Sequence, residues 1–138
     1  MTTSPSLELQ VAIVSRLTND AALAALVADR IYDDVPEDAV FPYITVGEGD
    51  ETSDDIECAP GFEISLDVDV WSQAVGFPEA KQISNAIRQA LKSPDLTLPV
   101  NALVYFQHRQ TRFLRDPDGK TRHAVLTFEA FAEQPKTP

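Results

Sequence analysis

The sequence predicts an α+β fold of two layers, in which helices pack on one face of a mixed, mostly antiparallel sheet of about four strands. Three observations predict this class. Residues 62–71 alternate between apolar and polar side chains, which is typical of a strand. Three other segments carry apolar residues at helical spacing. Near the C-terminus, two β-prone runs flank a turn sequence, which predicts a C-terminal β-hairpin.

Composition narrows the class of protein. The chain has 138 residues, and we expect one domain over 1–138 with disordered ends at 1–4 and 134–138. Lys and Arg number 11 against 22 Asp and Glu, and the net charge of −11 argues against a protein that grips nucleic acid through its phosphates. A single cysteine excludes an internal disulfide and fits a reducing cytosol. No apolar run approaches a membrane span and the N-terminus lacks a secretory pattern, so we expect no membrane partner.

Two helices are predicted in the N-terminal part. The first begins at Ser4 and Pro5, because serine is a good N-cap and proline suits the first helical position. Its apolar stripe consists of Leu9, Ile13 and Leu17, widened by Leu7, Val11 and Val14. The capping cluster 18–20 is predicted to end this helix and to start a second, alanine-rich helix, which carries Leu23, Leu26 and Val27.

An acidic stretch follows a short β-prone run at 43–46. Residues 47–57 contain six acids among eleven residues. They resemble a calcium loop superficially, but neither Asp50 nor Glu48 as a starting point places glycine at the sixth position. We therefore interpret 47–57 as a mobile, solvated excursion between strands, and keep metal binding as the alternative.

The strand at 62–71 has two different faces. Its apolar face consists of Phe62, Ile64, Leu66, Val68 and Val70. Its polar face carries a row of carboxylates, Glu63, Asp67 and Asp69, which we expect to be exposed. A helix is predicted from Pro78 to about Lys92, and its apolar stripe is the natural cover for the apolar face.

The C-terminal hairpin is predicted from two runs, 103–115 and 120–131. The residues between them, 116–119, place proline and glycine where a type I turn with a bulge prefers them. In the second arm, Leu126, Phe128 and Ala130 are expected to join the core. The first arm carries His108, Arg109, Arg112 and Arg115. We expect its arginines to form cross-strand ion pairs with the acidic row, with a small basic surface for a partner as the alternative.

No catalytic constellation is present in the sequence. His108 and His123 fall on opposite arms of the predicted hairpin, without a helical metal pair or a cysteine cluster. Neither a nucleophile elbow nor a phosphate-binding glycine loop occurs. Acid–base catalysis by paired carboxylates needs one buried member, and an exposed row does not meet that need. We therefore predict that the chain is not an enzyme and binds no cofactor.

Six short segments stand in an order that is shared with one family. They are residues 5–10, 30–33, 41–45, 70–72, 79–81 and 114–123, which together extend over nearly the whole chain. This pattern resembles the tail-terminator (tail-completion) protein family of long-tailed phages and of phage-derived gene transfer agents. The acidic residues 50–57 are the one variable region.

The resemblance implies a protomer of a hexameric ring at the head-proximal end of the tail of a virion or gene-transfer-agent particle, assembled in the bacterial cytoplasm. There the ring stops polymerisation of the major tail-tube protein and offers a docking face to the head–tail connector or stopper protein. It implies no cofactor and no reaction. Two alternatives stay open: another connector or stopper subunit of the same particle, and a small metal-dependent enzyme that uses the acids of 50–57.

The interface residues are inferred from this sequence alone. Cyclic rings use heterologous interfaces, in which one face of a subunit meets a different face of its neighbour. An acidic surface and an arginine-bearing hairpin suit such a pairing. The candidate interface residues are Glu63, Asp67, Asp69, Asp50, Asp54, Asp55, Arg109, Arg112 and Arg115. Six copies carry −66 formal charges (6 × −11), so we expect DNA to pass through the ring without specific binding.

Overall fold

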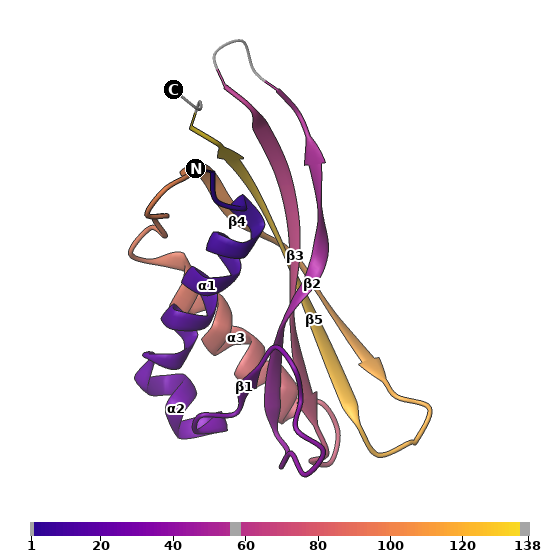
Figure 1. The fold of residues 1–138 in the computed structure, drawn as a ribbon. Coiled ribbons are helices and arrows are strands. Elements are labelled where there is room, and N and C mark those ends of the chain that lie inside the picture. The colour runs from indigo at the N-terminus through magenta and orange to yellow at the C-terminus, as the bar shows by residue number, and fades with distance from the viewer. Residues whose placement is uncertain (1, 56–58, 136–138) are drawn as a thin grey trace.

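The computed structural model describes residues 2–55 and 59–135. Over these residues the chain forms three helices and five strands, with one helical layer packed on one face of a single sheet (Figure 1). In chain order the elements are α1 Pro5–Thr18, α2 Ala21–Val27, β1 Ile31–Tyr32, β2 Tyr43–Ser53, β3 Gly61–Ser72, α3 Pro78–Lys92, β4 Ala102–Arg115 and β5 Arg122–Glu133. The predicted α+β class is confirmed.

The sheet is mixed and mostly antiparallel, as predicted. Its strands lie in the order β1-β2-β3-β5-β4. Only the two-residue β1 runs parallel to its neighbour β2, and the other three pairings are antiparallel. This short β1 is the strand beyond the expected four. The C-terminal hairpin is confirmed, and its second arm β5 lies between β3 and β4.

Strand β2 is longer than predicted. The excursion expected over 47–57 is wrong for its first half, because β2 continues to Ser53 and pairs with β3 along its length. The register shifts between Val46 and Gly49, which marks a bulge. A Cβ on Gly49 would lie 2.0 Å from the carbonyl oxygen of Ser65, so only glycine fits at this close approach. Pairing with β3 thus overrides the low β-propensity of glycine and acidic residues.

The helices begin and end where the sequence predicts. The Oγ of Ser4 accepts the Leu7 N–H at 3.2 Å and caps α1. A carboxylate oxygen of Asp20 accepts the Leu23 N–H at 3.0 Å and caps α2. The wider stripe expected on α1 is only partly correct, because Leu7 and Val11 are 55% and 60% exposed.

The core lies between the helices and the inner face of the sheet. Leu9, Ile13 and Leu17 of α1 are buried, as predicted. The inward residues of β3 and β5 are buried with them, namely Ile64, Leu66, Val68, Val70, Leu126, Phe128 and Ala130. Helix α3 adds its predicted stripe, Ile83, Ile87, Ala90 and Leu91. The opposite face of the sheet, here called the outer face, carries no helix (Figure 1).

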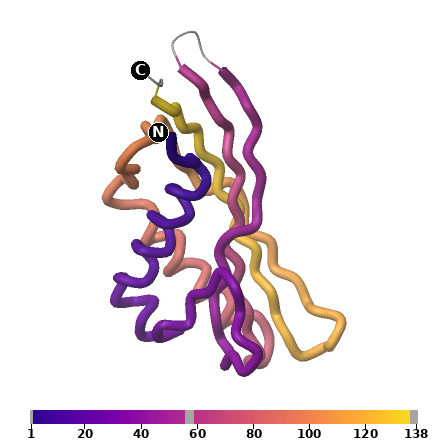
Figure 2. The backbone as a smooth tube through the Cα atoms, viewed as in Figure 1, coloured from indigo at the N-terminus to yellow at the C-terminus, as the bar shows by residue number. Residues whose placement is uncertain are grey.

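Two hairpins project from this body at opposite ends, as the backbone trace in Figure 2 shows. The β2–β3 hairpin extends past the helical layer, and the β4–β5 hairpin splays away at the other end. The β4–β5 turn lies where the sequence predicts it, and the Gly119 N–H donates to the Asp116 carbonyl oxygen at 3.0 Å. Gly119 follows with φ +72°. The Asp118 carboxylate also accepts the Lys120 and Thr121 N–H groups, each at 2.9 Å.

A buried carboxylate joins the N-terminal helix to the start of β4. Glu8 accepts the backbone N–H groups of Val100 and Asn101, each at 2.9 Å, and the Asn101 side-chain amide at 2.8 Å. The carbonyl oxygen of Thr3 accepts from the side chains of Asn101 and Gln134. Hydrogen bonds therefore involve Thr3 and Gln134, which belong to the two ends, 1–4 and 134–138, that were expected to be disordered. Met1 and 136–138 lie outside the described residues. No helix of the described chain is long and apolar enough to cross a membrane.

Candidate assembly interface

The acidic row Glu63, Asp67 and Asp69 lies on the outer face, but only one of its members is exposed to solvent there. Glu63 is exposed. Asp67 accepts the Thr127 hydroxyl at 2.8 Å, and Asp69 lies 2.6 Å from Nε2 of His123. Asp69 is only 9% exposed. The expected exposed row is thus wrong for two of its three acids, because the neighbouring strand β5 supplies their partners.

An aromatic row crosses the outer face beside these acids. Tyr43, Trp71 and His123 stand opposite one another on β2, β3 and β5. The Trp71 ring stacks on His123 with centroids 3.7 Å apart and on Tyr43 at 6.3 Å. Its indole N–H donates to the Thr45 hydroxyl at 3.0 Å. Sequence reasoning missed this row, because the register that aligns three distant strands is not visible in the local pattern.

The arginines of β4 do not meet the acidic row. Strand β5 separates β4 from β3, so the expected ion pairs with the carboxylates of β3 are wrong. Arg109 instead pairs with Glu129 of β5 at 3.1 Å, and their side chains are 64% and 34% exposed. Arg112 is exposed opposite Val125. These cations form a basic surface along β4, which was the alternative expected for them.

Arg115, unlike Arg109 and Arg112, does not belong to this basic surface, because its side chain lies against Phe77. Its guanidinium lies 5.4 Å from the centre of the Phe77 ring, on the helix-bearing side of the sheet. Lys81 and Arg122 approach the same ring at 5.9 and 5.7 Å. At the turn end of the β4–β5 hairpin, three cations thus gather around one aromatic side chain, attracted by the face of its ring.

The remaining candidate acids lie on the β2–β3 hairpin. Asp50 is exposed on β2, and Asp54 and Asp55 are exposed where the chain leaves that strand. The Asp54 N–H donates to the Gly61 carbonyl at 2.8 Å, which continues the hairpin past the end of β2. The structure therefore separates the candidate residues into an acidic group on β2 and β3 and a basic group on β4.

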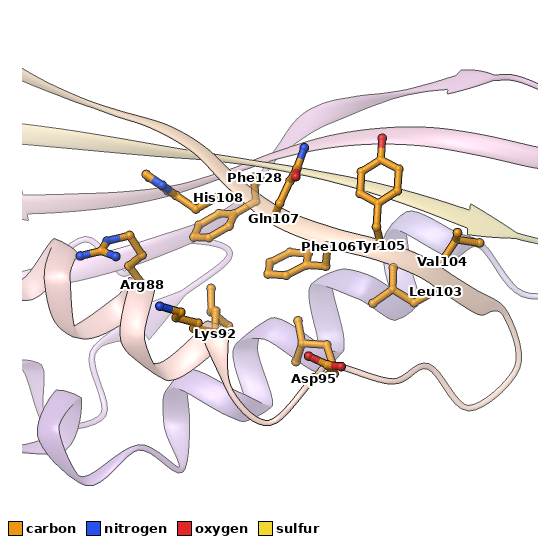
Figure 3. A pocket seen from close by; sticks show the side chains of 12 residues that line it. Arg88, Lys92, Asp95, Leu103, Val104, Tyr105, Phe106, Gln107, His108 and Phe128 are labelled. Atoms are coloured by element: carbon orange, nitrogen blue, oxygen red, sulfur yellow. The ribbon is translucent and has the colours of Figure 1, made fainter.

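A hollow of about 550 Å³ lies between the C-terminal half of α3 and the first half of β4 (Figure 3). Arg88 and Lys92 of α3 line the hollow together with the rings of Phe106 and Phe128, which stack with centroids 5.2 Å apart. Tyr105 points away from the helix. The lining therefore mixes apolar side chains with the charged Arg88, Lys92 and Asp95.

His108 is the titratable ring at this hollow. Burial, and then the nearby Arg88 guanidinium, hold the pKa of His108 below its usual range, so the ring is neutral at pH 7. It lies 2.7 Å from the Thr111 hydroxyl. Thr111 itself does not line the hollow.

Metal ligands do not converge in the part of the chain that the structure describes. Among residues 2–55 and 59–135, no three His, Cys, Asp or Glu side chains come together as a group able to hold a metal ion. The metal alternative for 47–57 falls partly on 56–58, which lie outside the described residues.

Comparisons with known proteins agree with one another. The model of the family "Tail completion protein gp17" matches residues 11–133. The tail completion protein gp17 of Bacillus phage SPP1 is 26% identical over 118 residues, which are 86% of this chain and 87% of that protein.

Solved structures with the same fold extend this result. A chain in the virion of a native gene transfer agent particle superposes with a TM-score of 0.86 and 30% identity, over 93% of this chain and 96% of that one. The structure of SPP1 gp17 shares the fold, with a TM-score of 0.59 and 24% identity, over 91% of this chain and 88% of that one. The chain therefore belongs to the tail completion protein gp17 family, as a structural tail component of a phage or gene transfer agent particle and not an enzyme.

Proposed function

We propose that this protein forms a ring, expected to be a hexamer, at the head-proximal end of the tail, where it terminates the tail tube and joins it to the head connector. The observation that carries this proposal is the superposition, at a TM-score of 0.86, on a chain of a gene transfer agent virion over nearly its full length. Its partners are further copies of itself, the major tail-tube protein and the head–tail connector or stopper protein.

The charge distribution of the protomer supports a heterologous ring. The acidic group, Asp50, Asp54 and Asp55 with Glu63, lies toward the β2 side of the sheet. The basic group on β4 lies at the other side of the same sheet. A surface of one sign on each side lets every copy attract the next in the same orientation, which is the condition for a closed cycle.

The same charges bear on the channel that DNA crosses. A ring of six copies has a formal charge of −66 (6 × −11), so its field repels phosphate and disfavours specific DNA binding. Glu63 is the one exposed member of the acidic row, so it is the member best placed to face the channel.

Electron microscopy and tail-tube polymerisation test the proposed function together. We expect the purified chain, alone or mixed with tubes of the cognate major tail protein, to form rings that sit on one tube end and halt growth. If the chain does not bind tubes but binds the head-side complex, it is instead another connector or stopper subunit. A chain that remains monomeric in the presence of both partners contradicts the proposal.

A further inference from the structure

Both sides of the sheet end in strands with unpaired backbone groups. Within the described chain, β4 pairs with β5 on one side and with no strand on its other side. At the opposite side, β1 pairs only with the start of β2, at Ile44 and Thr45. Among the described residues, no strand pairs with the second half of β2, residues 47–53, on that same side. Free edges present N–H and C=O groups that pair readily with another strand.

The two free edges carry opposite charges. The β2 segment 47–53 contains Glu48, Asp50 and Glu51, all exposed. Strand β4 carries Arg109 and Arg112, both exposed. Like charges directly opposite each other destabilise a strand pair, while opposite charges stabilise it. Two β4 edges therefore repel each other, as do two β2 edges, and the attractive combination is β4 with β2.

The strand directions permit this combination to extend the sheet. Successive strands in the order β2-β3-β5-β4 are antiparallel, so β4 runs opposite to β2. A second copy placed beside the first in the same orientation brings its β2 antiparallel to the first copy's β4. The alternation of directions then continues across the boundary between copies.

We propose that β4 of one copy pairs edge to edge, antiparallel, with residues 47–53 of β2 in the next copy, so that the sheets of the ring form one continuous band. The inference rests on the proposed ring and goes beyond it, because it names the contact that closes the ring. The contact is heterologous, and it supplies main-chain hydrogen bonds in addition to charge attraction.

Other features of β4 agree with an occupied edge. Val104, Tyr105 and Leu114 are 55%, 40% and 40% exposed, and an adjoining strand would cover part of this apolar surface. The register of β4 also shifts near Val104 and near Arg109. Such bulges and edge cations limit indiscriminate pairing, so they favour one acidic partner edge over any exposed strand.

A reciprocal charge swap tests the pairing without assuming its register. The basic-edge variant is Arg109→Glu with Arg112→Glu, and the acidic-edge variant is Asp50→Lys with Glu51→Lys. In either variant alone every edge contact is repulsive, so we expect half-assembly to need a protomer concentration about tenfold higher or more. In an equal mixture every alternating contact is attractive again, and we expect the ring mass to return, as measured by sedimentation.

A matched control and a cross-link complete the experiment. Glu37→Lys with Asp38→Lys changes the charge equally on the exposed loop before β2 and is expected to assemble normally. In a Cys58→Ser chain, Thr52→Cys and Gln107→Cys place thiols on the outer faces of the two edges. Oxidation of the assembled double variant is expected to give a ladder of covalent multimers, which neither single variant gives.

The outcomes separate this inference from the proposed function. If the wild-type chain forms rings that cap tubes, while both charge variants also assemble at the wild-type concentration, the edge pairing is wrong and the ring stands. If variants that retain the wild-type circular dichroism lose assembly and their mixture does not recover it, the edge pairing is likewise overturned. A wild-type chain that forms no ring with or without tubes overturns the proposed function itself.

Discussion

Replacement of Glu8 by glutamine is expected to destabilise the fold at neutral pH. The carboxylate accepts three hydrogen bonds at 2.8–2.9 Å from Val100 and Asn101 and is only 9% exposed. Glutamine keeps one acceptor oxygen but turns an NH₂ group toward a buried donor. An unsatisfied buried group costs about 1–3 kcal/mol, so Glu8→Gln should lower the free energy of unfolding by about that amount.

The pH dependence gives this prediction a definite sign. Although burial acts to raise it, hydrogen bonds from Asn101 and Val100 hold the pKa of Glu8 below its usual value of 4.5. A depressed folded-state pKa contributes stability that is present above the unfolded-state pKa and is lost as the pH falls through the folded-state value. The gap between wild type and Glu8→Gln should therefore be full at pH 7 and shrink below about pH 4.5.

Urea unfolding at several pH values measures this gap. Wild type, Glu8→Gln and the exposed control Glu37→Gln are compared at one protomer concentration, because assembly also stabilises the fold. We expect Glu37→Gln to unfold with the wild-type midpoint. A wild-type midpoint for Glu8→Gln at pH 7, or a gap that stays constant down to pH 3, would refute the role assigned to the buried carboxylate.

Three further predictions concern other contacts. Arg16→Ala removes donors to the Ala90 and Pro94 carbonyls at 3.0 and 2.7 Å and should lower the unfolding free energy by about 1–2 kcal/mol in thermal melts, with Arg16→Lys in between. Gly49→Ala should lower the urea midpoint of unfolding far more than Gly119→Ala, because a Cβ at position 49 would lie 2.0 Å from a backbone oxygen. A Cβ at position 119 has no atom within 4 Å, so Gly119→Ala should cost only about 1 kcal/mol, from its φ of +72°. His123→Ala should shift the emission of the single tryptophan to the red, since it removes a ring stacked at 3.7 Å; an unchanged spectrum contradicts that stack.

Local signals account for the parts of the fold that the sequence predicted. The caps at Ser4 and Asp20, the proline at position 78 and the turn 116–119 each act within a few residues, so the elements they bound could be placed before any contact was known. The alternation along β3 likewise identified its buried face, because strand periodicity depends only on the chain itself.

The errors arise where distant strands decide the outcome. Residues 47–53 have a strand-poor composition, and they join the sheet because β3 offers partners for 49–53 beyond the bulge. The pairing of Asp69 with His123 depends on β5 lying next to β3, which no local pattern encodes. Glu8 was overlooked for the same reason, since its partners lie more than ninety residues away. The acid in the first turn of α1 was the available signal.

The turn of the β4–β5 hairpin is held by hydrogen bonds from its own residues to the Asp118 carboxylate, which affects how it can bind a partner. Hydrogen bonds from Thr121 and Lys120 hold the pKa of Asp118 below its usual range, so the carboxylate stays ionised and the loop keeps its shape in mildly acidic solution. A surface that is already in its final form loses little conformational entropy when it docks. A protein that binds this tip therefore meets a turn already shaped by its own hydrogen bonds, rather than a segment that must first fold.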